Sequence, residues 1–72
     1  MKVGDTIDII YSTELSRMRL GDLVGREGTV VEIQRTHDGM VYGCWVSLIG
    51  EPYQDEEEWF IPQSAIGEWK NQ

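Results

Sequence analysis

Basic residues, cysteine and histidine are scarce in this chain, and each shortage excludes a class of function. Six Lys and Arg stand against 13 Asp and Glu, which gives a formal net charge of −7 over 72 residues. Proteins that bind nucleic acids or anionic membranes draw much of their affinity from Lys and Arg. The composition therefore disfavours both partners, unless the few arginines form a local cluster.

The single cysteine, Cys44, permits no internal disulfide, whereas small secreted domains usually carry several. The N-terminus has neither the basic start nor the apolar run of a signal peptide. No stretch approaches the roughly 20 apolar residues that a membrane-spanning helix needs. We therefore expect a cytoplasmic protein that does not enter a membrane.

Catalytic and metal-binding patterns are also missing. His37, the only histidine, stands at a predicted turn, and Cys44 lies further along the next strand. At about 3.3 Å per residue the two are more than ~10 Å apart, too far for a Cys–His nucleophile pair. Cys and His are too few for a closed zinc site, and so small a domain is a poor host for a deep substrate cavity. We predict a non-catalytic protein without cofactor, metal or small-molecule substrate.

The chain does contain short β-branched segments separated by glycine and proline. The predicted strands are Thr6–Tyr11, Gly28–Thr36, Val41–Ile49, Glu58–Ile61 and Ile66–Trp69. Asp38-Gly39 is the signal of a tight hairpin, and Gln63–Ala65 after Pro62 suits one 3₁₀ turn. Five short strands without a long helix are best accommodated by a small barrel. We predict a single all-β domain over residues 1–72.

The first connection, Ser12–Gly25, is long. Ser12 is suited to cap a helical turn, and the glycines at 21 and 25 prevent a long helix. Some of its apolar residues should pin it to the barrel; the candidates are Leu15, Met18, Leu20 and Leu23. The rest of the predicted core is Ile7, Ile9, Val30, Cys44, Val46, Leu48, Phe60 and Ile66.

The order of these elements resembles that of an SH3-like barrel. The stretch WFIPQSAI (59–66) is similar to the SH3 run of an aromatic residue, Ile, Pro, two small polar residues, Tyr and Val. CWVSL (44–48) is placed where SH3 domains carry the tryptophan that floors their ligand groove. Ala65 replaces the 3₁₀ tyrosine and the tyrosine pair of strand one is missing, so the resemblance does not extend to proline-rich ligands.

A second resemblance is to the KOW-type barrels of ribosomal proteins and transcription elongation factors. It rests on VGDTIDII (3–10) followed by GREGTVVEI (25–33). It implies an RNA or ribosome contact through Arg17, Arg19, Arg26 and Arg35. The simpler interpretation, which we favour, is a turn in which one or both glycines take positive φ, because Glu27 offsets Arg26 and four acids stand against the four arginines between positions 14 and 35.

The aromatic residues supply the candidate binding surface. Tyr42 shares the predicted core face with Cys44, Val46 and Leu48, and Trp45 lies on the opposite face. Trp45 is either an exposed interface anchor or packed under the first loop. Trp59 and Phe60 should point to opposite faces, with Phe60 in the core. We predict a shallow groove whose residues are Trp45, Trp59 and Pro62, with Tyr53 at its border.

Asp55, Glu56, Glu57 and Glu58 form an acidic block beside this groove. It is a docking edge for a basic partner, a weak calcium site or, by the interpretation we favour, a solvated loop; the ligand pattern of a calcium loop is absent. The leading prediction is a protein-interaction module or accessory subunit that binds a basic or apolar-anchored segment. The alternatives are a KOW-like RNA-contacting domain and an acidic mimic of nucleic acid.

Overall fold

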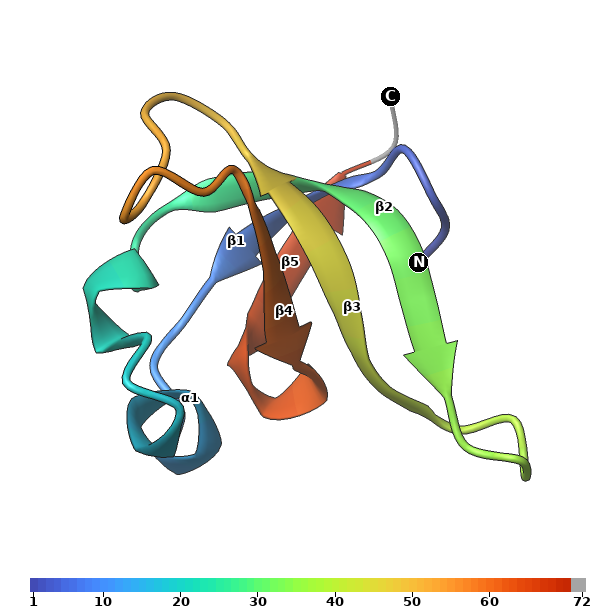
Figure 1. Cartoon of the computed structure of the whole chain (residues 1–72). Helices are drawn as coiled ribbons and strands as arrows, with labels where there is room; N and C mark the ends of the chain where they lie inside the picture. The colour runs from blue at the N-terminus through green and yellow to red at the C-terminus, as the bar shows by residue number, and fades with distance from the viewer. Residues whose placement is uncertain (71–72) are drawn as a thin grey trace.

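Five antiparallel strands form one sheet that curls into a half-barrel in the computed structural model, which describes the backbone of residues 1–70 and the side chains of residues 1–67 (Figure 1). The strands are β1 (Thr6–Ile9), β2 (Glu27–Arg35), β3 (Val41–Leu48), β4 (Glu58–Pro62) and β5 (Ile66–Lys70). Their order in the sheet is β4-β3-β2-β1-β5, which leaves β4 and β5 as its edges. The predicted all-β fold with five strands is confirmed.

The long first connection and the turn before the last strand both form where they were predicted. One 3₁₀ turn, η2 (Gln63–Ala65), stands directly before β5. Strand β1 ends at Ile9 rather than Tyr11, because the chain turns away there to enter the first connection. At this point the Ile9 carbonyl accepts a hydrogen bond of 2.8 Å from the Gly25 nitrogen, and the Ile10 nitrogen donates one of 2.8 Å to the Ala65 carbonyl. No helix within residues 1–70 has the length and apolar character needed to cross a membrane.

The first connection contains a short helix, α1 (Thr13–Arg17), and a 3₁₀ turn, η1 (Gly21–Leu23). Ser12 is the N-cap of α1, and its hydroxyl accepts a hydrogen bond of 2.9 Å from the Leu15 N–H. This bond satisfies one of the helix's unpaired N–H groups. Leu15, Leu20 and Leu23 are buried in the core, whereas Met18 is 39% exposed. Three of the four candidate residues therefore pin the connection to the sheet.

Two irregularities in the pairing of β2 with β3 decide which side chains face outward. Val30 pairs with Val46 and Glu32 with Trp45, so Val31 is an extra residue between them. Tyr42 is likewise extra between the pairs that join Gln34 to Gly43 and Arg35 to Val41. Such bulges break the two-residue alternation of a strand. As a result Tyr42 is 49% exposed, and its prediction as a core residue is wrong.

The core lies on the concave side of the sheet, under the first connection. It consists of Ile7, Ile9, Leu15, Leu20, Leu23, Val30, Cys44, Val46, Leu48, Ile61, Ala65 and Ile66. The prediction of Phe60 as a core residue is wrong. Phe60 pairs with the outward-facing Trp45, and its neighbour Ile61, which pairs with the buried Cys44, fills the core position. Cross-strand pairs share a face, so the register of β4 on β3 makes this choice.

Candidate protein-interaction surface

Aromatic rings form a row across the outer face of β3 and β4. The Phe60 ring lies between Trp45, at 5.9 Å between ring centroids, and Tyr42, at 6.0 Å. Phe60 covers Gly43: a Cβ atom there would lie 2.8 Å from Phe60 Cε1 and 2.7 Å from the Ile61 carbonyl oxygen. Real Cβ atoms do not approach other atoms so closely. Glycine at position 43 is therefore what allows the Phe60 ring to pack over this part of β3.

Trp59 points to the other side of β4, because it pairs with the core residue Val46. Its ring packs edge-on against Tyr53 at 5.4 Å between centroids, and its Nε1 donates a hydrogen bond of 3.0 Å to the Glu56 carbonyl. The Tyr53 hydroxyl contacts Asp22 Oδ2 at 3.2 Å, which joins the acidic loop to η1. Trp59 and Tyr53 are thus held in fixed positions at the margin of the core.

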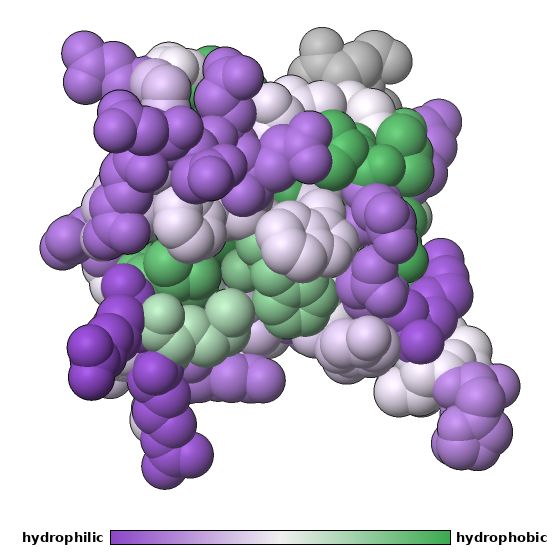
Figure 2. All heavy atoms as spheres, in the orientation of Figure 1, coloured by the Kyte–Doolittle hydropathy of each residue, from purple (hydrophilic) through white to green (hydrophobic). Residues whose placement is uncertain are grey.

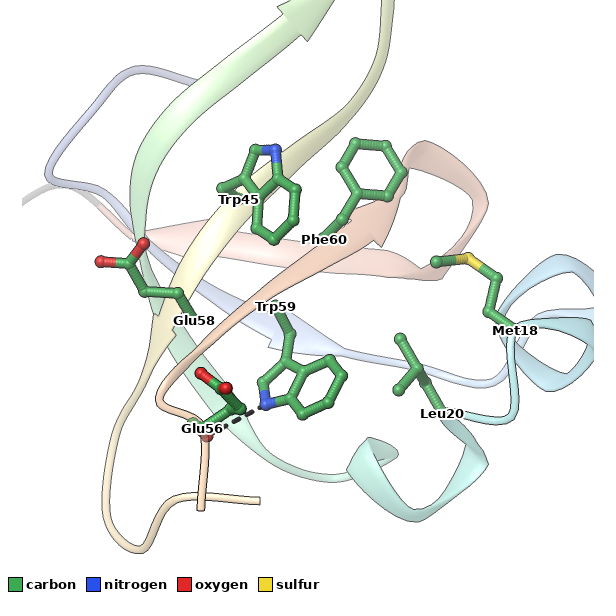
Figure 3. A pocket seen from close by; sticks show the side chains of 7 residues that line it. All are labelled: Met18, Leu20, Trp45, Glu56, Glu58, Trp59 and Phe60. Atoms are coloured by element: carbon green, nitrogen blue, oxygen red, sulfur yellow. Dashed lines mark hydrogen bonds between the residues drawn. The ribbon is translucent and has the colours of Figure 1, made fainter. Parts of the chain in front are cut away.

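An apolar hollow of about 460 Å³ lies at the free edge of β4. It is lined by Met18, Leu20, Trp45, Glu56, Glu58, Trp59 and Phe60. Figure 3 shows Trp59, Trp45 and Phe60 on one side and Met18 and Leu20, from the segment between α1 and η1, on the other. The hollow therefore forms where both faces of the edge strand meet the first connection.

A second hollow, of about 450 Å³, lies on the β2 side of Trp45. It is lined by Val31, Glu32, Trp45 and Glu58, and we call it the acidic hollow. The bulge at Val31 creates it, because the extra residue turns both Val31 and Glu32 toward Trp45. Trp45 and Glu58 line both hollows. Figure 2 shows apolar and aromatic surface in the middle of this face, with hydrophilic side chains around it.

The charges at these hollows are all negative. Glu32, Glu56 and Glu58 line them, and no Lys, Arg or His side chain of the described residues does. Asp55 and Glu57 are exposed on the adjoining loop, where Gln54 and Asp55 have φ of 51° and 64°. Backbone hydrogen bonds of 2.9 Å between Tyr53 and Glu56 close this turn. Acids concentrated beside an apolar surface favour a cationic partner.

The structure brings most of the predicted groove residues together. Trp45 is 39% exposed, as an interface anchor requires, and Trp59 and Tyr53 are half-buried. Pro62 is buried and does not line the hollow, because it pairs with Gly43 at the inner end of β4. The sequence analysis placed Met18 and Leu20 in the first connection and Phe60 in the core, and it did not identify any of them as lining the hollow. Only the fold of the first connection places Met18 and Leu20 beside β4.

The four arginines do not form one cluster, because they lie in three different parts of the fold. Arg26 donates from Nη2 to the Ile49 carbonyl at 3.1 Å and to the Glu51 carbonyl, so it binds the loop after β3. Arg35 donates to the Gly39 carbonyl at 3.2 Å within the β2–β3 hairpin. Arg17 ends α1 and Arg19 follows it, and α1 lies at the other side of the molecule from that hairpin (Figure 1). Gly25 has φ of 91°, as the turn interpretation predicts.

Titratable chemistry adds little to this surface. Cys44 is buried on the core face, and burial raises the pKa of its thiol from 9.0 to about 11. The thiol is therefore protonated and poorly nucleophilic. Within the described residues, no three His, Cys, Asp or Glu side chains are grouped closely enough to hold a metal ion.

Comparisons with protein-family models, curated proteins and solved structures found no match to this chain.

Proposed function

We propose that the chain is an SH3-like barrel that acts as a non-catalytic protein-interaction module, or as an accessory subunit of a larger assembly. The observation that carries the proposal is Trp45, an exposed tryptophan that separates an apolar hollow from an acidic one. Tryptophan is among the residues that most often dominate the free energy of protein association. We propose the cytoplasm as its location, in keeping with its one unpaired cysteine.

The arrangement of elements supports the SH3-like assignment. A long connection follows β1, the two longest strands are central, and a 3₁₀ turn precedes β5. The apolar hollow lies between that long connection and β4, and it is lined by Trp45, whose position the resemblance assigns to the floor of the ligand groove. Domains that bind proline-rich helices line their grooves with several aromatic residues. The SH3 tyrosines that are missing here therefore argue for a partner of another kind.

Pre-organisation of the aromatic residues supports a binding role. Phe60 contacts Trp45 and covers Gly43, and Trp59 is held by Tyr53 and by the Glu56 carbonyl. Side chains that are already ordered lose little conformational entropy when a partner docks. A hollow of about 460 Å³ that is open to solvent suits one or two side chains of a peptide. These features favour recognition of a short segment of another protein.

Selection of peptides tests the proposal. A displayed library of random 12-residue peptides is selected on the wild-type protein, and affinities of enriched peptides are measured for wild type and Trp45→Ala. We expect Trp45→Ala to weaken binding at least about tenfold. Tyr11→Ala is the matched control, because Tyr11 is an exposed aromatic residue that lines neither hollow.

The same variants separate binding from folding, since circular dichroism and urea unfolding show whether Trp45→Ala keeps the fold. Enriched peptides that bind folded Trp45→Ala as well as wild type would refute the proposal.

Amide shift mapping with single-stranded RNA tests the KOW-like alternative. Shifts at the arginines that vanish at high salt, as phosphate contacts do, would favour that alternative instead.

A further inference from the structure

The free edge of β4 exposes backbone groups that nothing in the described chain satisfies. The Leu48 N–H bonds the Glu57 carbonyl at 2.7 Å, which makes Leu48 and Glu57 a hydrogen-bonded pair. Antiparallel pairing alternates, so Trp59 and Ile61 also bond toward β3, whereas Glu58 and Phe60 direct their N–H and C=O groups away from it. Pro62 fits this alternation, because its nitrogen, which has no hydrogen to donate, faces outward too.

These outward groups lie beside the apolar hollow, since Glu58 and Phe60 both line it. Within residues 1–70, no hydrogen bond is found to the outward-facing N–H and C=O groups of Glu58 and Phe60. Met18 and Leu20 stand across the hollow rather than against the strand (Figure 3). The edge is therefore open to a further strand along Glu58–Phe60, and Pro62 ends the available pairing.

We infer that the partner segment binds as an added β-strand on the edge of β4, with an apolar side chain beside Trp59 and a basic side chain beside Glu58. This inference rests on the proposed function and specifies how the segment is held. In strand addition, main-chain hydrogen bonds supply affinity and side-chain pockets supply specificity.

The two sides of the added strand face different chemistry, because successive side chains of a strand point to opposite faces. The side chain opposite Trp59 enters the apolar hollow, against Met18 and Leu20. Its neighbours lie on the face of Phe60 and Glu58, where the carboxylates of Glu58 and Glu32 and the Trp45 ring surround the acidic hollow. A guanidinium or ammonium group pairs with those carboxylates and contacts the tryptophan ring.

The acidic block argues for a basic partner rather than a second copy of this chain. A copy that paired through its own β4 edge would add its own acids and contribute no Lys or Arg, because residues 51–66 contain none. Like charges on paired strands repel each other, and charged residues on edge strands prevent such self-association. The same carboxylates attract a Lys or Arg of a different protein, so the charge pattern selects the occupant.

The test uses one peptide enriched by the wild-type protein, resynthesised with a single N-methyl group at each residue in turn. N-methylation removes one backbone donor and leaves the side chain in place. We expect affinity to fall about tenfold at two positions, two residues apart, whose N–H groups are donated to the Glu58 and Phe60 carbonyls, and to change little at the residue between them. The Phe60 and Glu58 amides should become protected from exchange in the complex.

Charge variants test the second part of the inference. Glu58→Gln should weaken the peptide severalfold and reduce its salt dependence, whereas Asp38→Asn, which removes the same charge from the hairpin tip, should not. Binding that needs Trp45 but shows no two-residue periodicity in the N-methyl series would overturn strand addition and leave the interaction function standing. Loss of the Trp45 dependence would overturn both. A dimer with protected Phe60 and Glu58 amides in the absence of peptide would overturn the choice of occupant.

Discussion

Replacing Gly43 by alanine tests the packing that forms the candidate surface. The φ angle of Gly43 is not in the left-handed region, so its backbone accepts alanine without strain. In an open strand position, Gly→Ala stabilises by about 0.5–1 kcal/mol, because glycine loses more entropy on folding. The opposite is expected here, since the new Cβ would lie 2.8 Å from Phe60 Cε1 and 2.7 Å from the Ile61 carbonyl oxygen.

The size of the effect follows from those two contacts. Overpacking of this kind costs about 1–3 kcal/mol. Displacement of the Phe60 ring also removes its edge contact with Trp45, and such contacts contribute about 0.5–1.5 kcal/mol. These costs add to about 1.5–4.5 kcal/mol, and the entropic gain from alanine offsets about 0.5–1 kcal/mol, so we expect Gly43→Ala to lower the free energy of unfolding by about 1–4 kcal/mol. For a domain of this size, whose total stability is only about 4–10 kcal/mol, that is a large fraction.

Urea unfolding followed by tryptophan fluorescence measures the change. Gly21→Ala is the matched control, because a Cβ at Gly21 meets nothing within 4 Å. Repeating Gly43→Ala in a Phe60→Ala background removes the ring but keeps the Ile61 carbonyl, and its cost should fall by at least about 1 kcal/mol. A Gly43→Ala protein as stable as Gly21→Ala would refute the inferred packing of Phe60 on Gly43.

Two further predictions concern the first connection and the core. Ser12→Ala should cost about 1 kcal/mol by removing the cap of α1, and Ser12→Asn should recover most of it; equal stability of Ser12→Ala and wild type in urea would contradict the cap. Burial holds the Cys44 thiol neutral, with its pKa raised from 9.0 to about 11, so native protein should resist alkylation at pH 8 while urea-unfolded protein reacts. This pKa difference leaves stability unchanged below pH 9 and lowers it between pH 9 and 11, because only the unfolded thiol ionises there.

Much of the fold is legible in local sequence signals. The β-branched runs, the Asp38-Gly39 hairpin and the Pro62 break act over a few residues, so strand positions and the 3₁₀ turn could be predicted. Which residues of β4 face the core could not be predicted, because the adjacent residues Trp59, Phe60 and Ile61 are all apolar. Only their pairing with Trp45 and Cys44 on β3 decides which of them is buried.

The candidate surface was predictable only in part, for similar reasons. Trp45 stood out because its strand neighbours on the same face are small. The acidic hollow depends on the bulge at Val31, and a bulge is a property of two paired strands that no single-strand pattern contains. The apolar hollow depends on Met18 and Leu20, which are distant in sequence from β4 and lie beside it because the first connection is packed on the core through Leu15 and Leu23.

The hydrogen bonds of Arg26 have a consequence for how this scaffold tolerates change. Its guanidinium holds the loop after β3 by the carbonyls of Ile49 and Glu51, which every amino acid possesses. Hydrogen bonds to backbone carbonyls do not depend on which side chains the bound segment carries. Exposed side chains of this loop, such as those of Glu51 and Glu57, are therefore free to vary while the loop keeps its attachment to the start of β2. One arginine thus keeps the loop attached while its exposed acids change, without any change to the core.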